Sequence, residues 1–398
     1  MVVINNCNCK TFPQLISIFL QQNFTYMSAD KNWYQIKNID ELDSPALVIF
    51  PDRVKQNIQT AISMVGDVNR LRPHIKTHKS PDVSRLMIDA GITKFKCATI
   101  SEAEMLGQCG AKDVVLAYQP LGPKLKRFIE VIKKYPGTSY SCLTDNKDAA
   151  KEQSATFLAA GLTIPVFIDL NIGMNRTGIA PGNEAIELYK YISGLKGINL
   201  HGLHAYDGHL RNPDIAARTK ECNEGFAPVE KMRAELENSG YPVPVVIAGG
   251  SPAFPVHANR KNVECSPGTF VYWDKGYSEL CPEQPFLTAA VLVTRIISLP
   301  SATRITTDLG HKSVAAENEI TRRVFFLNTD NVKPVGQSEE HLVLEVPSGN
   351  AYKVGDVLYG IPYHVCPTIA LYERAYTVEN GKVNGEWKTI ARDRKITV

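Results

Sequence analysis

Residues 70–82 of the chain read "RLRPHIKTHKSPD" and begin with a short strand-like run, "LRPHIK" (71–76), that ends on a lysine. Further short apolar runs follow along the chain, and the spacing between successive runs leaves room for one helix. A regular alternation of strands and helices predicts a parallel sheet with crossover helices. The further runs span 95–99, 114–118, 139–143, 166–170, 199–206, 245–249 and 262–266.

Eight strands of this kind, spread over roughly 200 to 230 residues, are typical of a (β/α)8 TIM barrel. After Cys281 the pattern changes to alternating positions without helical spacing, as in "HLVLEV" and "RAYTVENGKV". Such segments predict antiparallel strands joined by hairpin turns. We therefore predict an α/β protein that consists of a barrel and a C-terminal antiparallel β domain.

The predicted organisation of the chain has four parts. The barrel spans residues 45–281, the β domain spans residues 282–398, and residues 31–44 pack with the β domain. Residues 1–30 form an extension that we expect to be disordered, and Met27 is an alternative start of the protein.

Composition excludes several classes of function. The 44 basic residues nearly balance the 41 acidic ones, so no overall positive field attracts nucleic acid or an anionic membrane. No apolar run reaches the roughly 18 to 20 residues needed to span a bilayer. The nine cysteines are scattered through apolar segments, which favours a reducing compartment, and the N-terminus lacks the features of a signal peptide. We therefore expect a cytoplasmic protein.

The basic cluster in residues 70–82 raises the question of a reactive lysine. Crowding of Lys76 by Arg72, by Lys79 and by a protonated His74 or His78 would lower the pKa of its ammonium group, and the neutral amine could then form a Schiff base. A solvated basic loop explains the cluster about as well. A nucleic-acid patch is less favoured because the cluster contains no aromatic residues.

Other candidate residues follow the predicted strands, where the mouth of a barrel holds its active site. Gly249, Gly250 and Ser251 follow the seventh strand, at a common place for a phosphate-binding loop, although they could form a plain turn. Arg176 lies in a glycine-containing loop after the fifth strand. Its guanidinium group could hold a phenolate, a carboxylate or a phosphate, or could form a structural salt bridge.

The segment "PYHVCPT" in the β domain places His364 two residues before Cys366. If this segment is a strand, both side chains emerge on one face and can share a borderline-soft cation such as Zn²⁺. Two ligands are too few for a structural zinc site, so the pair suits a catalytic ion with open positions. The alternative is a buried pair without metal.

Several motifs together resemble one enzyme family. They resemble the D-threonine aldolase and D-serine dehydratase group of pyridoxal phosphate enzymes, which share the alanine racemase type of barrel. The resemblance extends from about Trp33 to the C-terminus. The motifs are "RPHIKTHK", "KFKCATISEAEML", "GMNRTGI", "GLHAYDGH", "ECSPGTFVYWD", "DLGHK" and "HVCPT".

The resemblance implies a role for each candidate. Lys76 looks like the lysine that joins pyridoxal 5'-phosphate as a Schiff base. The remaining matches are Arg176 near the ring oxygen of the cofactor, Tyr206 beside the ring, Gly249, Gly250, Ser251 and Tyr272 at the phosphate, and His364 and Cys366 as the metal pair. The divalent ion expected for such a pair is zinc first, with manganese or magnesium as alternatives.

The function implied by the resemblance is a lyase that acts on a small D-3-hydroxy amino acid, most similar to D-threonine aldolase. D-serine or D-3-hydroxyaspartate dehydratase is the alternative, because H-x-C resembles the dehydratases whereas other motifs resemble the aldolases. An amino-acid racemase and a pyridoxal phosphate homeostasis protein without turnover rank lower. His204 and His209 are both candidate bases. The family also implies a homodimer.

Overall fold

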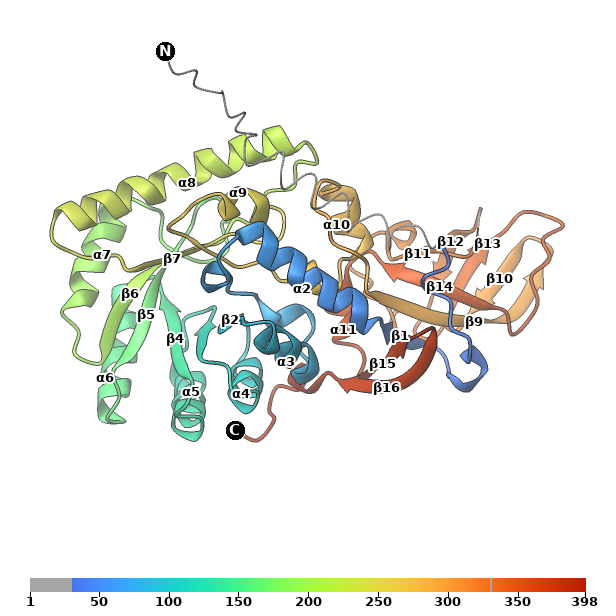
Figure 1. The fold of residues 1–398 in the computed structure, drawn as a ribbon, viewed down its shortest axis with the longest axis horizontal. Coiled ribbons are helices and arrows are strands. Elements are labelled where there is room, and N and C mark those ends of the chain that lie inside the picture. The colour runs from blue at the N-terminus through green and yellow to red at the C-terminus, as the bar shows by residue number, and fades with distance from the viewer. Residues whose placement is uncertain (1–30, 330) are drawn as a thin grey trace, which may run out of the picture.

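The computed structural model describes residues 31–329 and 331–398 and consists of two parts that lie side by side (Figure 1). One part is a parallel sheet surrounded by helices, and the other is a second, mostly antiparallel sheet. This architecture confirms the predicted fold class. The predictions for residues 1–30 and for Met27 lie outside the described residues.

The parallel sheet contains the predicted strands two to eight in chain order, each paired with the next. Every strand is short and mostly buried, as expected where helices cover the outside of a parallel sheet. The strands are β2 (Lys94–Cys97), β3 (Asp113–Leu116), β4 (Ser139–Thr144), β5 (Ile164–Leu170), β6 (Ile198–Ala205), β7 (Val245–Ala248) and β8 (Glu264–Cys265).

The first predicted strand, residues 71–76, closes the barrel. It is present only as two isolated β-bridges. Leu71 bridges β8 and His74 bridges β2, both in parallel orientation. The Lys96 amide donates to the carbonyl of Pro73 over 2.8 Å. Because Pro73 has no N–H group, it cannot continue the hydrogen-bond ladder, and this explains the irregular strand.

Side chains fill the barrel interior in layers. At the end where the strands begin, the buried Arg72 binds Glu264 over 2.6 Å and Asp113 over 2.7 and 2.8 Å. Above this ionic layer lies an apolar layer of Val115, Leu143, Phe167 and Ile247. The interior is therefore a packed core that leaves only its upper end for a ligand.

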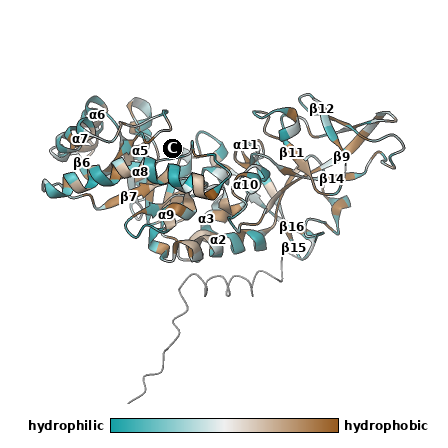
Figure 2. Cartoon of the chain, turned by 90° about the horizontal axis from the view of Figure 1, so that it is seen from above, coloured by the Kyte–Doolittle hydropathy of each residue, from teal (hydrophilic) through white to brown (hydrophobic). Residues whose placement is uncertain are grey.

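Helices surround the barrel, and several of them begin at residues that stabilise the first turn of a helix. Ser80 and Thr99 accept backbone hydrogen bonds at the starts of α3 and α4, and Pro81 occupies the first turn of α3. Figure 2 shows mainly hydrophilic residues along α8. The helices are α2 (Pro51–Val65), α3 (Pro81–Asp89), α4 (Ile100–Gln108), α5 (Gly122–Lys134), α6 (Lys147–Ala159), α7 (Asn183–Ser193), α8 (Ile215–Asn238), α9 (Phe254–Ala258), α10 (Lys275–Leu280) and α11 (Val365–Ile369).

The second sheet is built around the long strand β9, which pairs with β1, β10 and β14. Two of its strands, β1 and β12, were not predicted as strands from the sequence. The strands are β1 (Ala46–Ile49), β9 (Ala290–Ser301), β10 (Arg304–Thr307), β11 (Val324–Phe326), β12 (Lys333–Gln337), β13 (Leu342–Glu345), β14 (Val357–Pro362), β15 (Arg374–Glu379) and β16 (Lys382–Lys388).

Strand β1 changes two details of the predicted organisation. It pairs antiparallel to β9 and parallel to β15, so this sheet is mixed rather than purely antiparallel. Residues 46–49, which the sequence analysis assigned to the barrel, therefore lie in the second sheet. The chain enters the barrel region with α2, directly after β1.

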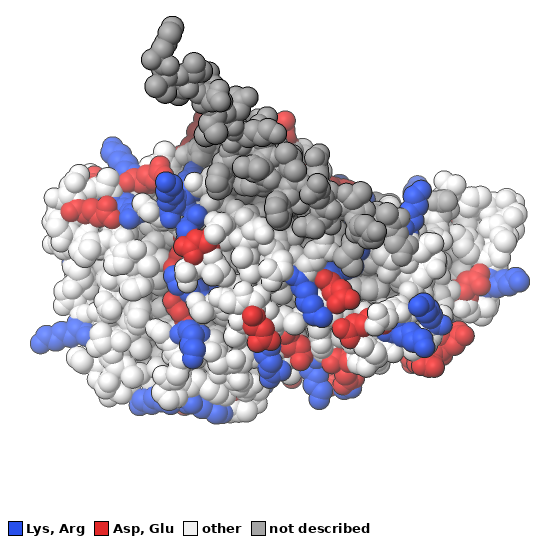
Figure 3. All heavy atoms as spheres, viewed as in Figure 1, with Lys and Arg blue, Asp and Glu red and all other residues white. Residues whose placement is uncertain are grey.

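On the face shown in Figure 3, acidic and basic side chains are interspersed rather than separated into single-sign patches. Among the described residues, no helix is both long and apolar enough to cross a membrane.

Candidate active site

Lys76 lies at the mouth of the barrel, where the barrel meets the second sheet. It belongs to the single-turn helix η3 (Ile75–Thr77), which follows the barrel-closing segment and lies against α11. The positive charge of Lys76 acts on His74, Lys96 and Cys366. The amine therefore faces groups from both parts of the molecule.

Two of the groups predicted to crowd Lys76, Arg72 and Lys79, have carboxylate partners. Arg72 is paired with carboxylates at the opposite end of the barrel interior. Lys79 forms an ion pair with Glu102 of α4, whose side chain is fully buried. Both cations are thus neutralised by specific partners.

A layer of polar side chains, which we call the polar floor, lies beneath the mouth and consists of His74, Lys96, Asp169 and His204. Lys96, Asp169 and His204 each stand next to the last residue of their strands. Lys96 Nζ lies 3.4 Å from His204 Nε2, and His204 Nδ1 lies 2.7 Å from Asp169 Oδ1. Burial and the charge of Lys76 lower the pKa of Lys96 to about 7. Burial and the charge of Lys96 lower the pKa of His204.

Tyr206 follows β6 and lies between several predicted site residues. The Arg176 guanidinium carbon lies 5.1 Å from the centre of the Tyr206 ring, and Lys96 Nζ lies 5.5 Å from it. A Cβ on Gly250 would meet the Tyr206 ring at 3.0 Å. The structure thus brings Arg176, Tyr206 and the loop after β7 together at the mouth.

Backbone N–H groups converge on Ser251 in this loop. The amides of Gly268 and Thr269 donate to Ser251 Oγ over 3.3 and 3.2 Å. Gly249 has a φ of 83°, a left-handed conformation that favours glycine. The Ser251 hydroxyl group therefore joins the ends of β7 and β8, at the place where the phosphate loop was predicted.

Tyr272 follows Thr269 in the same turn of the chain, and its side chain is buried in the apolar core. Burial, together with the neighbouring Asp82 carboxylate, raises the pKa of its hydroxyl group. Its predicted contact with a phosphate group stays a prediction.

His364 and Cys366 form a hydrogen-bonded pair, but the predicted strand at this point is wrong. The strand β14 ends before His364, and Cys366 lies in the first turn of α11. Against the cost of burial, their mutual hydrogen bond raises the pKa of His364 to about 9 and lowers that of Cys366. Cys366 Sγ also lies 3.0 Å from Thr77 Oγ1, directly beside Lys76. The pair therefore offers one nitrogen and one sulfur donor next to the candidate lysine.

Comparison with known families decides the assignment of the fold. Residues 49–275 match the model described as "Alanine racemase, N-terminal domain", which covers more than half of the chain, and residues 289–378 match a serine dehydratase domain. The chain belongs to the alanine racemase N-terminal domain family.

Named relatives that match most of the chain include lyases. A 3-hydroxy-D-aspartate aldolase from Paracoccus denitrificans is 25% identical, with 89% of this chain and 93% of the relative covered. A D-threonine aldolase from Arthrobacter sp. is also 25% identical, with coverage of 88% and 93%. The solved D-threonine aldolase from Filomicrobium marinum is 26% identical, covers 88% of this chain and 96% of its own, and has a TM-score of 0.80.

The family implies pyridoxal phosphate, and the residues present fit this cofactor. Lys76 supplies an amine, and the loop at Ser251 supplies donors for a phosphate group. Within the described part of the chain, the buried His74 Nε2 has no hydrogen-bond partner and faces the charges of Lys76 and Lys96. A Cβ on Gly268 would meet the His74 carbonyl oxygen at 2.8 Å, so this glycine allows the backbone segments to approach closely.

The barrel of this alanine racemase-type protein also contains a buried cluster of Asp207, Cys222 and His257 that the sequence analysis missed. Their potential ligand atoms lie within 4.8 Å of one another, so the group has the composition of a metal site. Asp207 Oδ2 lies 2.8 Å from His257 Nε2, and Asp207 Oδ1 accepts from the Gly250 amide over 3.0 Å. Burial raises the pKa of Cys222 to about 12, which favours a thiol over a thiolate ligand. The cluster therefore supports the loop after β7.

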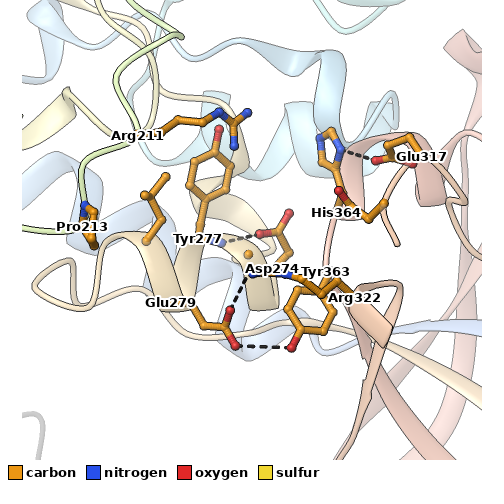
Figure 4. Close-up of a pocket in the computed structure, with 12 residues that line it drawn as sticks. Arg211, Pro213, Asp274, Tyr277, Glu279, Glu317, Arg322, Tyr363 and His364 are labelled. Atoms are coloured by element: carbon orange, nitrogen blue, oxygen red, sulfur yellow. Dashed lines mark hydrogen bonds and ion pairs between the residues drawn. The ribbon is translucent and has the colours of Figure 1, made fainter. Parts of the chain in front are cut away.

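A second missed residue is Glu317, whose Oε1 lies 2.5 Å from Nδ1 of His364. Figure 4 shows this contact at the edge of a pocket of about 630 Å³. Asp274, between α10 and α11, also lines this pocket, and burial raises the pKa of its carboxyl group to about 6. No local pattern points to Glu317, because it lies 47 residues before His364 in an irregular segment.

Proposed function

We propose that the chain is a pyridoxal phosphate- and metal-dependent lyase that acts on D-3-hydroxy amino acids. Within this class we place first a D-threonine aldolase type of reaction, which cleaves the substrate between Cα and Cβ into glycine and an aldehyde. The observation that carries the proposal is the meeting of Lys76 from the barrel with the His364–Cys366 pair from the second sheet.

In this proposal the barrel mouth holds the cofactor. Lys76 binds it covalently, Arg176 and Tyr206 flank its ring, and the loop containing Ser251 binds its phosphate group. The bound pyridoxal phosphate would supply an electron sink for a bond broken at the α carbon. The polar floor beneath Lys76 excludes bulk water, since Lys96 and His204 are buried.

The second sheet would supply the metal ion. Imidazole and thiolate donors favour zinc over manganese or magnesium, which prefer oxygen ligands. Glu317 holds Nδ1 of His364 and so orients the ring, as carboxylates do for metal-bound histidines. A bound ion would act as a Lewis acid toward the β-hydroxyl group of the substrate.

The choice between the aldolase and the dehydratase reaction depends on which proton of the substrate is removed. Removal of the β-hydroxyl proton leads to cleavage of the Cα–Cβ bond, whereas removal of the α-proton by Lys76 leads to loss of the hydroxyl group. His204 is unsuited as the base for the hydroxyl group, because Asp169 and Lys96 already contact its two ring nitrogens. His209 lies beside Gly173 at the exposed rim of the mouth and stays a candidate.

A dehydratase that releases ammonia and a 2-oxo acid is the second candidate function. It is favoured by the cysteine in the His364–Cys366 pair and by the match of residues 289–378 to a serine dehydratase domain. A racemase would leave the metal pair without a role, and a homeostasis protein without turnover would leave the whole second sheet without a role.

Product analysis tests the proposal directly. Purified protein loaded with pyridoxal phosphate and zinc is incubated with D-threonine, D-serine and D-3-hydroxyaspartate, and the products are identified by chromatography. Glycine and an aldehyde support the aldolase. Ammonia and a 2-oxo acid without glycine would show that the second candidate is correct, and absence of turnover on all three substrates would refute both.

We further propose a homodimer in the cytoplasm. The seven cysteines named among the described residues are free, as expected in a reducing compartment. Analytical ultracentrifugation measures the oligomeric state.

A further inference from the structure

The pocket beside His364 lies between the barrel mouth and the second sheet (Figure 4). The loop after β6 contributes Arg211, α10 contributes Tyr277 and Glu279, and the segment before β11 contributes Arg322. His364 lines this pocket at one side. A substituent that extends outward from the metal pair would therefore enter it.

The carboxylates in the pocket already have partners. Glu279 binds Arg322 over 3.1 Å, and it also contacts Lys275 and Tyr363 over 3.4 and 3.3 Å. The other two carboxylates are satisfied as well, because Asp274 accepts the backbone amides of Tyr277 and Val365 and Glu317 contacts His364.

Arg211 is the exception among the charged side chains of the pocket. Within the described residues it has neither a hydrogen bond nor an ion pair, although its charge acts on Asp274 and Tyr277. Figure 4 shows Arg211 above the Tyr277 ring, across the pocket from His364 and far from Glu279. The pocket thus presents one cation that forms no ion pair with a carboxylate of its described lining.

We propose that Arg211 binds a carboxylate attached to the β carbon of the substrate, which makes the preferred substrates 3-hydroxy dicarboxylic amino acids. The smallest such compound is 3-hydroxyaspartate. The inference rests on the proposed function, because it takes the β-hydroxyl group to lie at His364 and Cys366.

The order of groups along the site supports this assignment over binding of the α-carboxylate. Lys76 acts electrostatically on Cys366, His364 lines the pocket two residues before Cys366, and Arg211 lies across that pocket from His364. The α carbon must stay close to Lys76, so the group that reaches Arg211 is the substituent on the β carbon. A guanidinium group binds a carboxylate with two parallel hydrogen bonds but offers nothing specific to the methyl group of threonine.

A binding experiment tests the role of Arg211 without turnover. D-Aspartate carries the β-carboxylate but no β-hydroxyl group, and D-alanine lacks both. The dissociation constants of the two compounds are measured from changes in the visible absorbance of the holoenzyme. We expect wild type to bind D-aspartate more tightly than D-alanine, and Arg211→Met to lose about tenfold to a hundredfold of this preference.

Arg322→Met is the matched control, because it removes an equal charge from the same pocket but from an arginine that is already paired. It should keep the preference for D-aspartate. An unchanged preference in Arg211→Met, or an equal loss of affinity for both compounds, would overturn the assignment.

Turnover then separates the inference from the proposed function. The ratio of kcat/KM for D-3-hydroxyaspartate over D-threonine should fall in Arg211→Met by a similar factor, while kcat/KM for D-threonine stays unchanged. A protein that binds D-aspartate through Arg211 but cleaves no hydroxy amino acid refutes the proposed lyase and leaves the carboxylate site standing. A protein that cleaves D-threonine in preference to D-3-hydroxyaspartate refutes the carboxylate site alone.

Discussion

Two lysines, Lys76 and Lys96, face the barrel mouth, and they differ in their burial and their contacts. Lys76 lies at the end of the barrel-closing segment, whereas Lys96 is buried in the polar floor and contacts His204. We predict that borohydride reduction of the protein loaded with pyridoxal phosphate fixes the cofactor on Lys76 and leaves Lys96 unmodified. Peptide mass mapping measures this. A label on Lys96 would show that the assignment of Lys76 is wrong.

The buried Lys96 leads to a second prediction, which concerns the dependence of protein stability on pH. Its pKa of about 7 in the folded protein lies below the ordinary value of 10.5, so between these values the unfolded chain binds one proton more. Stability contributed by this group therefore rises with pH across that window, by at most about 1.4 kcal/mol per pH unit. Below pH 7 both states are protonated, and the folded state bears the full cost of the buried ammonium group.

Urea denaturation of the cofactor-free protein at pH 7 and pH 9.5 measures this effect. Lys96→Met should be stabilised relative to wild type at pH 7 and much less so at pH 9.5. Lys94→Met is the control, since Lys94 precedes Lys96 by two residues on β2 and is paired with Glu264. An identical pH dependence in wild type and Lys96→Met would contradict the shifted pKa.

Residue types alone predicted the candidate side chains of the site but not their ionic partners. Arg72 precedes His74 by two residues on an extended segment, so it lies one layer deeper in the barrel and cannot crowd Lys76. Its partners Asp113 and Glu264 lie 41 and 192 residues away along the chain. The buried state of Lys96 likewise depends on His204, which is 108 residues distant. No local pattern carries such information.

At the scale of elements, the turn after β7 joins the predicted phosphate loop to the cluster of Asp207, Cys222 and His257. Gly249 has a φ of 83°, and a Cβ there would lie 2.7 Å from the His257 ring. His257 is fully buried and held by Asp207, so the ring cannot move aside. The turn therefore requires glycine for two reasons, its backbone conformation and the lack of space.

Alanine substitutions at two glycines separate the cost of the backbone conformation from the cost of the missing space. Gly240 has a φ of 82° with open space around it, so Gly240→Ala should cost only the strain of the left-handed conformation, about 1 to 2 kcal/mol. Gly249→Ala should cost a further 1 to 3 kcal/mol or so from overpacking, and should weaken cofactor binding. Urea denaturation and fluorescence titration with pyridoxal phosphate measure the two effects. Equal costs for the two variants would show that the contact with His257 is unimportant.

Elements with strong local patterns were predicted well, and those defined by distant partners were not. The seven strands β2 to β8 coincide with the predicted runs because each combines an apolar sequence with a helix-length spacer. Strand β1 has an equally apolar sequence, but its partners β9 and β15 lie more than 200 residues further along the chain. The alternating run "DVLYGIPYHV" predicted a strand that reaches His364, whereas Thr368 Oγ1 donates to the His364 carbonyl within the first turn of α11.

At the scale of the whole molecule, the candidate site exists only where the two parts meet. The amide of Val365 donates to Asp274, and Cys366 contacts Thr77, so the start of α11, directly after His364, is anchored to the barrel at two points. The C-terminal residues add a further contact, because the amides of Thr397 and Val398 donate to Glu104 of α4. The two parts are therefore joined at the metal pair and again at the end of the chain.

This division of the site predicts that cofactor and metal can be removed separately. Dialysis against a chelator should abolish lyase activity and leave the visible absorbance of the cofactor in place, because Lys76 and the Ser251 loop belong to the barrel alone.

Cys366→Ala should behave like the chelated protein, and Glu317→Gln should lower the metal affinity by about tenfold to a hundredfold, since Glu317 only orients His364. Cys109→Ala, which changes a half-buried thiol hydrogen-bonded to Pro81, is the matched control and should retain both groups. Metal content measured by atomic emission, absorbance spectra and product formation before and after addition of zinc distinguish the variants. Full activity in the chelated protein, with no metal left by emission, would mean that His364 and Cys366 serve the lyase reaction without an ion, and the proposed division of labour between the two parts would be lost.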